Sequence, residues 1–239
     1  MGTPAGRPDT AVSRYTRRRF LDIARVEPGR VRVLPNVVGA SFGPGAKSDC
    51  LLDRHGLRGR KVLLTVGRLA GDERGKGHDR LIAALRDLRQ TAPDLVYLIV
   101  GDGDDRDRLQ ALAHQEGVAN AVRFAGVVGA QELADYYRVA DLFVMPSTQE
   151  GFGIVFLEAA SSGLRVIGGN RDGSADALAD GVLGRLIDPL DAGQLVAAIQ
   201  QALVRGGTEP VQVQRFRFEN FARHLHGLIA DHLLQPAAA

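Results

Sequence analysis

The feature that most constrains the fold is a regular alternation of short apolar runs with longer amphipathic segments. Six short runs are mostly apolar and rich in β-branched residues, which is typical of strands buried on both faces. They lie at Val62–Val66, Leu95–Val100, Val122–Ala125, Leu142–Met145, Leu164–Ile167 and Leu183–Ile187. Because single helical patterns separate them, we predict an α/β fold with a doubly wound, parallel six-stranded sheet.

The segments between these runs carry apolar residues at spacings of three and four, as expected for helices packed on a sheet. One such stripe comprises Leu81, Ile82, Leu85 and Leu88. Another, around Leu195 and Ile199, follows Asp191 and Gln194, a pair typical of a capped helix start.

Two flanking regions lie outside this alternation. Residues 1–45 comprise a leader without apolar pattern, a basic helix near Ser13–Ala24 and a Pro/Gly-rich linker at Pro35–Gly45. Residues 46–207 form the predicted α/β domain. Residues 208–239 form a connector and a final helix with an apolar stripe of Phe218, Phe221, Leu225, Leu228, Ile229 and Leu233. We therefore expect flanking helices at both ends of the domain.

Composition excludes several classes of protein. Hydrophobic residues make up 45% and charged residues 24% of the 239 residues, which argues against disorder. No apolar run approaches the roughly 20 residues of a membrane span. The net charge of +2 gives no reason to expect a nucleic-acid partner. Cys50 is the only cysteine, which excludes intramolecular disulfides and favours a cytoplasmic location.

Positive charge is concentrated near the start of the chain. Residues 1–32 carry eight arginines against Asp9, Asp22 and Glu27. A solvated helix face is the favoured interpretation, and peripheral contact with an anionic membrane or with an acceptor is the alternative.

Two cations follow the first predicted strand. Ligands of doubly wound sheets bind beyond the carboxyl ends of the strands. Here the first strand leads to Gly67 and Arg68, and the next helix begins after Lys76, which has a glycine on each side. A guanidinium and an ammonium group beside a helix N-terminus suit a diphosphate. Two solvated surface cations are the alternative.

Two glutamates occupy different settings after the fourth strand. Glu150 precedes two glycines and therefore lies in a loop, whereas Glu158 is the only charge in the apolar helix that follows. A buried carboxylate is costly without partners. Ribose hydroxyls would serve, and the free amides at the start of this helix would meet the adjoining phosphate. An ion pair of Glu158 with Arg165 or Arg185 is the alternative.

These residues resemble the C-terminal domain of the family-4 retaining glycosyltransferases, which have two facing Rossmann-like domains in the GT-B fold. The resemblance runs from about Ser13 to Leu234. It rests on Val33-Leu-Pro-Asn-Val37, Val66-Gly-Arg-Leu69, Lys76-Gly-His-Asp79, Val100-Gly-Asp-Gly103, Val122-Arg-Phe-Ala-Gly126 and the pair Glu150-x7-Glu158.

The resemblance implies a role for each site residue. Arg68 and Lys76 would hold the departing diphosphate, Glu150 would face the donor sugar as the third catalytic group, and Glu158 would bind the ribose. Other donor contacts would come from Gly67, Gly101, Gly103, Arg123, Phe124, Gly151, Phe152, Gly153, Ile154 and Val155, with Arg123 and Phe124 near the base. A closing segment would include Gly173, Asp176, Gly184 and Asp188-Pro189.

The implied reaction is transfer of a hexosyl group from a nucleoside-diphosphate sugar to an acceptor hydroxyl, with retention and without a metal or other cofactor. The acids Asp102, Asp104, Asp105 and Asp107 lack the spacing of a calcium loop, and we predict that they cap a helix near residue 105. The base, the sugar and the acceptor, whether glycan or lipid, stay open.

Most of the family's N-terminal domain is expected to be absent, and residues 13–37 resemble only its last helix and the link that follows. Expected partners are therefore the nucleotide sugar and either a separate N-terminal half or a second copy, held through exposed apolar surface. Alone, the chain is expected to bind the donor without transferring sugar. A nucleotide-sugar epimerase of the same fold and a non-catalytic binding remnant are the alternatives. Gly101-x-Gly103 lacks the third glycine of the dinucleotide fingerprint, which argues against an oxidoreductase.

Overall fold

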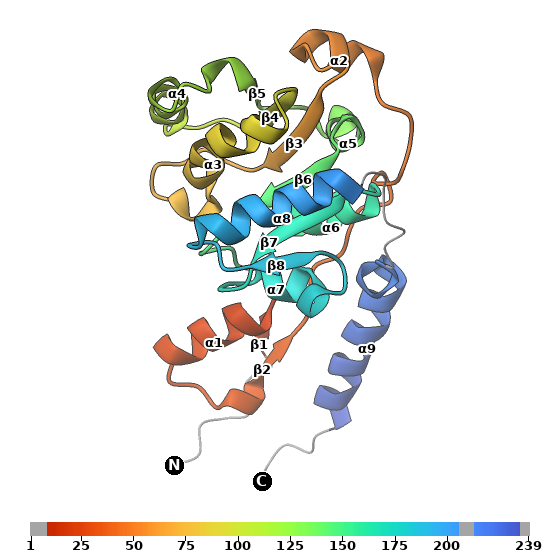
Figure 1. Cartoon of the computed structure of the whole chain (residues 1–239). Helices are drawn as coiled ribbons and strands as arrows, with labels where there is room; N and C mark the ends of the chain where they lie inside the picture. Colours follow the sequence, from red (N-terminus) through yellow and green to blue (C-terminus); the bar gives the residue numbers. More distant parts are fainter. Residues whose placement is uncertain (1–8, 206–212, 235–239) are drawn as a thin grey trace.

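The computed structural model of the chain describes residues 9–205 and 213–234 (Figure 1). Its centre is a parallel six-stranded sheet in the order β5-β4-β3-β6-β7-β8. The strands are β3 (Lys61–Val66), β4 (Leu95–Val100), β5 (Val122–Gly126), β6 (Leu142–Met145), β7 (Arg165–Gly169) and β8 (Arg185–Ile187). The predicted fold class and all six predicted strands are confirmed.

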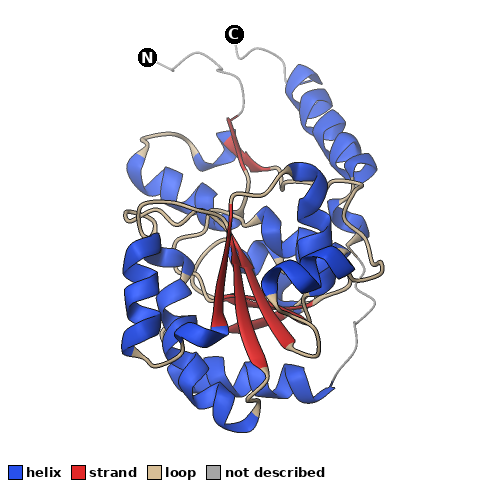
Figure 2. Ribbon diagram, turned by 90° about the horizontal axis from the view of Figure 1, so that it is seen from above, coloured by secondary structure: helices blue, strands red, loops and turns tan. Residues whose placement is uncertain are grey.

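Helices cover both faces of this sheet (Figure 2). One face carries α3 (His78–Thr91), α4 (Arg106–Gln115) and α8 (Ala192–Arg205), and the other carries α2 (Asp49–His55), α5 (Ala130–Val139), α6 (Ile154–Ser161) and α7 (Ser174–Ala177). Successive strand residues serve opposite faces. Leu64 joins the core under α5 and α6, whereas its neighbour Leu63 joins the core under α3 and α8.

The helical predictions have mixed outcomes. The predicted stripe of α3 is buried, and the Asp191 carboxylate accepts a hydrogen bond of 2.9 Å from the Gln194 amide at the start of α8, as predicted. The sequence did not predict α2, because its seven residues offer only the adjacent Leu51 and Leu52 in place of a periodic stripe. Within the described residues, no helix is long and apolar enough to cross a membrane.

The seam between β3 and β6 is the shortest pairing inside the sheet. It has two registered pairs, Leu63 with Leu142 and Leu64 with Phe143, whereas β3 and β4 have six. Asp141 extends the seam, since its carboxylate accepts from the Val62 amide at 2.8 Å and its own amide donates to the Val62 carbonyl at 2.9 Å.

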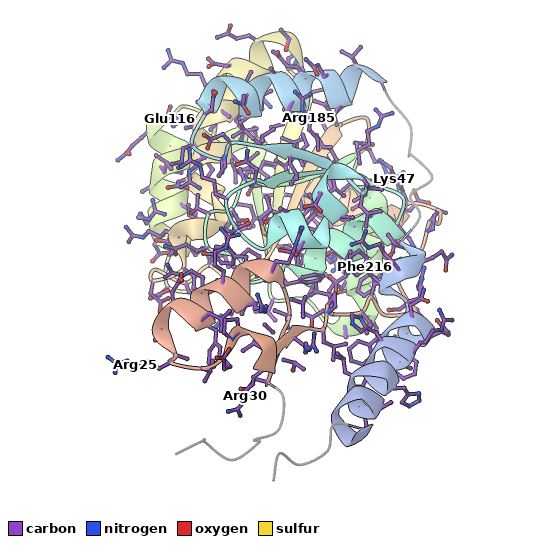
Figure 3. All side chains as sticks on the ribbon, turned by 90° about the horizontal axis from the view of Figure 1, so that it is seen from below. Arg25, Arg30, Lys47, Glu116, Arg185 and Phe216 are labelled. Carbon is purple, nitrogen blue, oxygen red and sulfur yellow. The ribbon has the colours of Figure 1, made fainter. Side chains whose placement is uncertain are left out.

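A separate two-stranded parallel sheet lies near the start of the chain. It comprises β1 (Asp9–Ala11) and β2 (Val31–Val33), joined by α1 (Arg14–Ile23) and the 3-10 turn η1 (Pro28–Arg30). We call these elements the N-terminal unit; Arg25 at its far end points away from the rest of the molecule (Figure 3). The basic helix is confirmed. The sequence did not predict the two strands, because three residues are too few for a pattern. Residues 1–8 of the predicted leader lie outside the described residues.

The final helix, α9 (Phe218–Leu234), lies at the periphery of the molecule (Figures 1 and 2). Phe216, in the 3-10 turn η5 (Gln214–Phe216) that precedes it, is 3% exposed and reaches the core. By contrast, Phe218 is 66% and Ile229 47% exposed. The predicted apolar stripe of this helix is therefore only partly covered. The Leu233 side chain and residues 206–212 of the connector lie outside the described residues.

Candidate functional site

The carboxyl ends of β3 and β6 lie side by side and build the candidate site. Strand order reverses direction here, since β4 and β5 follow on one side of β3 and β7 and β8 on the other side of β6. Such a switch point leaves a crevice between the loops that leave the two strands. The loops are residues 67–77 and 146–153, and the Thr148 amide joins them by donating to the Gly75 carbonyl at 2.8 Å.

An ion pair lies between these two loops. Lys76 Nζ is 3.0 Å from Glu150 Oε2, and each side chain is 19% exposed. The pair borders a cavity of about 190 Å³ that is lined by Arg68, Glu73, Gly75, Lys76, Gln149 and Glu150. All three residues predicted as catalytic therefore line one cavity, although they are 82 positions apart in sequence at the extremes, from 68 to 150.

Arg68 sits at the mouth of this cavity. Its side chain is 76% exposed and pairs with Glu73 of the same loop. Glu73 was not among the predicted site residues, because a carboxylate in a phosphate-binding loop has no place in the resemblance. A diphosphate would have to compete with this carboxylate for the guanidinium group, because Glu73 partly neutralises the positive charge of Arg68 at the cavity.

Three predicted glycines bring backbones together behind the cavity. A side chain on Gly67 would press against the aliphatic part of Lys76, with Cδ at 3.0 Å. A side chain on Gly101 would collide with the Gly67 carbonyl, and one on Gly103 with the Leu69 carbonyl. Gly101 and Gly103 therefore allow the start of the loop after β3 to pass close to the end of β4, and Gly67 leaves room for the Lys76 side chain.

The peptide of Glu150 is held by a residue that the sequence did not reveal. Asp172 is 4% exposed, and its two carboxylate oxygens accept from the Glu150 amide at 2.7 Å and the Ser174 amide at 2.9 Å. The Gly173 amide in turn donates to the Glu150 carbonyl at 2.8 Å. An Asp-Gly pair separated by two residues from the end of a strand was the available signal.

Helix α6 begins beside the same cavity. Gly153 precedes it with φ +82°, a conformation that favours glycine, and the amides of Ile154 and Val155 form its first turn. Phe152 faces the other way, since it is 2% exposed and packs edge-on against Phe216 at 5.9 Å. Residues 151–155 can therefore offer a ligand their backbone, but the Phe152 ring belongs to the core.

Glu158 lies within α6 and is 9% exposed. The Tyr137 hydroxyl donates to its Oε2 at 2.7 Å. Burial raises the pKa of Glu158 above its ordinary value, and the hydrogen bond from Tyr137 lowers it in part. The alternative of an ion pair with Arg165 or Arg185 is wrong, since neither arginine is among the groups that act on the Glu158 carboxylate. The sequence did not identify Tyr137 as the partner.

Arg123 and Phe124 are not brought to this cavity. Arg123 donates to the carbonyls of His55 and Asn120, at 3.2 and 2.9 Å, which holds it against the end of α2. Phe124 lies under the Arg106 guanidinium, 5.6 Å from its ring centre. Phe124 thus faces the start of α4, while the Arg123 side chain lies near the amino end of β5.

The acidic run after β4 makes contacts of its own. Asp105 precedes α4, but its carboxylate pairs with the Arg108 side chain at 2.6 Å and makes no hydrogen bond to the backbone as a cap. Asp102 pairs with Arg106 at 2.8 Å, and Asp104 accepts from the Gly71 amide at 2.8 Å. Capping near residue 105 was thus wrong in detail. In the described part of the chain, no three His, Cys, Asp or Glu residues cluster as metal ligands.

A larger cavity, of about 670 Å³, lies between α3 and α8. Its lining is mostly alanine, leucine and valine; it includes Pro189 of the predicted closing segment but none of the predicted catalytic or donor-binding residues. Its polar side chains are limited to Arg80, Asp87 and Gln200, and neither Lys76 nor Glu150 borders it. The smaller cavity, where these two side chains meet at the switch point, is therefore the better candidate.

Comparison with known families shows which family the chain belongs to. The family model "Glycosyl transferases group 1" matches residues 52–214. The chain belongs to this family.

Two relatives show how much of a group 1 glycosyltransferase is present. The chain is 35% identical over 202 residues to the GDP-mannose-dependent alpha-(1-6)-phosphatidylinositol monomannoside mannosyltransferase of Mycolicibacterium smegmatis, covering 81% of this chain and 52% of that protein. It is 32% identical over 244 residues to the D-inositol 3-phosphate glycosyltransferase of Acidothermus cellulolyticus, covering 93% and 52%. The chain thus spans about half the length of these relatives.

Solved glycosyltransferase structures share the fold. Anabaena HepE, in complex with UDP-glucose, superposes with a TM-score of 0.79 at 23% identity, covering 93% of this chain and 63% of that one. Sucrose-phosphate synthase of Thermosynechococcus elongatus gives 0.77 at 26% identity, covering 94% and 58%. The expected likeness to one half of a GT-B glycosyltransferase is confirmed.

Proposed function

We propose that this chain is the donor-binding part of a retaining glycosyltransferase and that it binds a nucleoside-diphosphate sugar at the cavity between Lys76 and Glu150. Transfer to an acceptor hydroxyl is proposed for the whole protein, because the chain spans about half the length of its relatives. The acceptor would need a second wall opposite this cavity to be held against the donor.

The ion pair of Lys76 and Glu150 carries this proposal. A nucleotide sugar presents an anionic diphosphate next to a sugar rich in hydroxyl groups, so it requires a cation and a hydrogen-bond acceptor side by side. Lys76 Nζ and Glu150 Oε2, 3.0 Å apart, offer both from opposite loops. On binding, the diphosphate would replace Glu150 as the partner of Lys76, and the sugar hydroxyls would replace Lys76 as partners of Glu150.

The start of α6 and the buried Glu158 would extend the site along the donor. The amides of Ile154 and Val155 point out of a helix N-terminus, which favours a phosphate oxygen. Tyr137 holds one oxygen of Glu158, and ribose hydroxyls would donate to the other. The relatives support this class of donor, since one is named as GDP-mannose-dependent and HepE was solved with UDP-glucose.

During the reaction, the bond between the anomeric carbon and the diphosphate oxygen breaks, and negative charge grows on that oxygen. Once the diphosphate has displaced Glu150 from Lys76 and Glu73 from Arg68, the two cations would stabilise this charge electrostatically. We propose that these two cations do so without a metal ion.

Calorimetric titration with UDP-, GDP- and ADP-sugars, in the presence of a chelator, tests the proposal. Lys76→Ala should weaken a nucleoside diphosphate about tenfold or more and leave the matching nucleoside unchanged, because it removes one charge-assisted contact to phosphate. Lys47→Ala is the matched control. Lys47 pairs with Asp141 at a distance of 2.7 Å, and neither residue lines the cavity.

Two results would contradict this function. One is the absence of binding by every nucleotide sugar at millimolar concentration. The other is an equal loss for nucleoside and diphosphate in Lys76→Ala, which would show that the ammonium group does not contact phosphate. Glu158→Gln should differ from Lys76→Ala by weakening the nucleoside as well, and a variant that only unfolds would assign Glu158 a purely structural role.

A further inference from the structure

The Gly151 carbonyl, next to Glu150, accepts two hydrogen bonds from far away in the sequence. Ser13 Oγ donates to it at 2.5 Å and Thr16 Oγ1 at 2.9 Å. These donors lie 138 and 135 positions away, in the N-terminal unit. Ser13 is fully buried, so its hydroxyl has no access to water as an alternative partner. Both lone pairs of one loop carbonyl are thus satisfied by side chains.

The opposite side of the same loop is held by the turn after β7. Asp172 accepts from the Glu150 amide, and the Gly173 amide donates to the Glu150 carbonyl. Gly173 also lies so close that any side chain on it would collide with the Gly151 carbonyl. The two peptide units at residues 150 and 151 are therefore held between the N-terminal unit and the α/β domain.

The N-terminal unit reaches this loop mainly through polar groups. None of the ten residues of α1 is buried. Arg14 pairs with Asp176 at 2.6 Å and with Asp180 at 2.5 Å, which ties the start of α1 to α7 and the turn after it. Inside the unit, Arg17 donates to the carbonyls of Val31 and Pro28. One set of contacts thus shapes the unit, and a different set joins it to the Glu150 loop.

We propose that Ser13 and Thr16 are positioning residues for Glu150, and that the N-terminal unit sets the geometry of the sugar end of the donor site. A shift of α1 would move the Gly151 carbonyl and, through the adjoining peptide, the Glu150 carboxylate relative to Lys76. The phosphate end would respond less, since Lys76 and Arg68 lie on the other loop. The role of Glu150 as the sugar-facing group rests on the proposed function. The hydrogen bonds that tie the Glu150 loop to Ser13 and Thr16 do not depend on it.

Thr16 gives the cleaner test, because Ser13 also caps α1 by accepting from the Thr16 amide at 2.8 Å. Thr16→Val keeps the shape of the side chain and removes the donor, and Thr16→Ser keeps the donor. Thr91→Val is the matched control, since the Thr91 hydroxyl donates to the Leu88 carbonyl in α3, far along the chain from this loop.

Two measurements on the folded protein separate positioning from general stability. In Thr16→Val, amide hydrogen exchange over residues 149–153 should accelerate, and the affinity gained by adding the sugar to the nucleoside diphosphate should fall about threefold to tenfold, the size of one hydrogen bond. Affinity for the bare nucleoside diphosphate should fall by a smaller factor. Thr16→Ser and Thr91→Val should behave like the original chain in both measurements.

Unchanged exchange in a folded Thr16→Val would overturn the hold on the loop. An equal loss for the diphosphate and the sugar nucleotide would overturn the specific link to Glu150. If the original chain binds no nucleotide at all, the proposed function fails, and the exchange measurement alone still decides whether the N-terminal unit orders the loop.

Discussion

Replacing His78 with asparagine should remove part of the protein's sensitivity to acid. His78 opens α3 directly after the Lys76 loop, and its side chain is only 6% exposed. Its Nδ1 lies 2.9 Å from the Tyr97 hydroxyl. That hydroxyl donates to Thr65, and the Thr65 hydroxyl donates to the Val144 carbonyl. Each proton in this chain is thus assigned, so Nδ1–H must be the donor to Tyr97.

Protonation of His78 would place the second proton on its other ring nitrogen, Nε2, and would cost free energy there. Nε2 is buried and has no hydrogen-bond partner among the described residues. A second proton there would create a buried cation, and burial, with a smaller contribution from Lys76, lowers the pKa of His78 to about 4. The other charged groups that act on the imidazole are Asp79, Asp105 and Arg108.

The magnitude follows from linkage between protonation and folding. The unfolded chain binds a proton at His78 near pH 6.5, whereas the folded chain does so only near pH 4. The free energy of unfolding therefore falls as the pH drops through this window and levels off below it. One pKa unit corresponds to about 1.4 kcal/mol, so His78 should cost the fold about 3 kcal/mol once both states are protonated.

Urea unfolding at pH 7 and pH 4.5 provides the assay. The original chain should lose about 2 to 3 kcal/mol more than His78→Asn between these two values. Asparagine can still donate to Tyr97 but cannot titrate, and subtracting the two profiles removes what other groups contribute. Equal losses in both proteins, or an imidazole that titrates above pH 6 by NMR, would refute this account.

Three further substitutions test the site and its supports. Tyr137→Phe should raise the pKa of Glu158 further, because the hydrogen bond that lowers it is lost; a carboxyl titration by NMR that does not move would contradict this. Gly101→Ala should destabilise the fold by at least about 2 kcal/mol more than Gly117→Ala, since both have positive φ but only Gly101 abuts a carbonyl; similar urea midpoints would argue against the close approach. Asp172→Asn keeps one acceptor for two amides and should cost about 1.5 to 3 kcal/mol, and a neutral effect on thermal unfolding would show that this carboxylate does not hold the Glu150 loop.

The sequence predicted the sheet well because its signals are local. Each of the six strands is a short, mostly apolar run, and the helices that pack on the sheet carry apolar stripes. Local signals also placed Lys76 and Glu150 in loops at the same edge of the sheet, but they did not predict that the two side chains pair. The motif resemblance added the assignment of roles, which stays a prediction, and the structure brings the three residues to one cavity.

What the sequence could not predict depends on contacts between distant segments. Tyr137 on α5 partners Glu158 on α6, and neither residue carries a mark of the other. Asp172 and Ser13 hold the Glu150 loop only because three loops meet there in space. Arg123 was placed near the base by motif position alone, and the orientation of its side chain toward α2 follows from carbonyls that no motif contains.

The short seam between β3 and β6 has a consequence for how the protein folds. The strands β3, β4 and β5 form one half of the sheet, and β6, β7 and β8 form the other, each from neighbouring stretches of chain. Joining the halves pairs Leu63 with Leu142, which closes a long loop for only two registered pairs. We therefore expect this joining to be a late event, and the cavity, which straddles the seam, to appear only when it is complete. A ligand that contacts both Lys76 and Glu150 would bind only the chain in which the two halves of the sheet are joined. Its binding would shift the folding equilibrium toward that state by mass action.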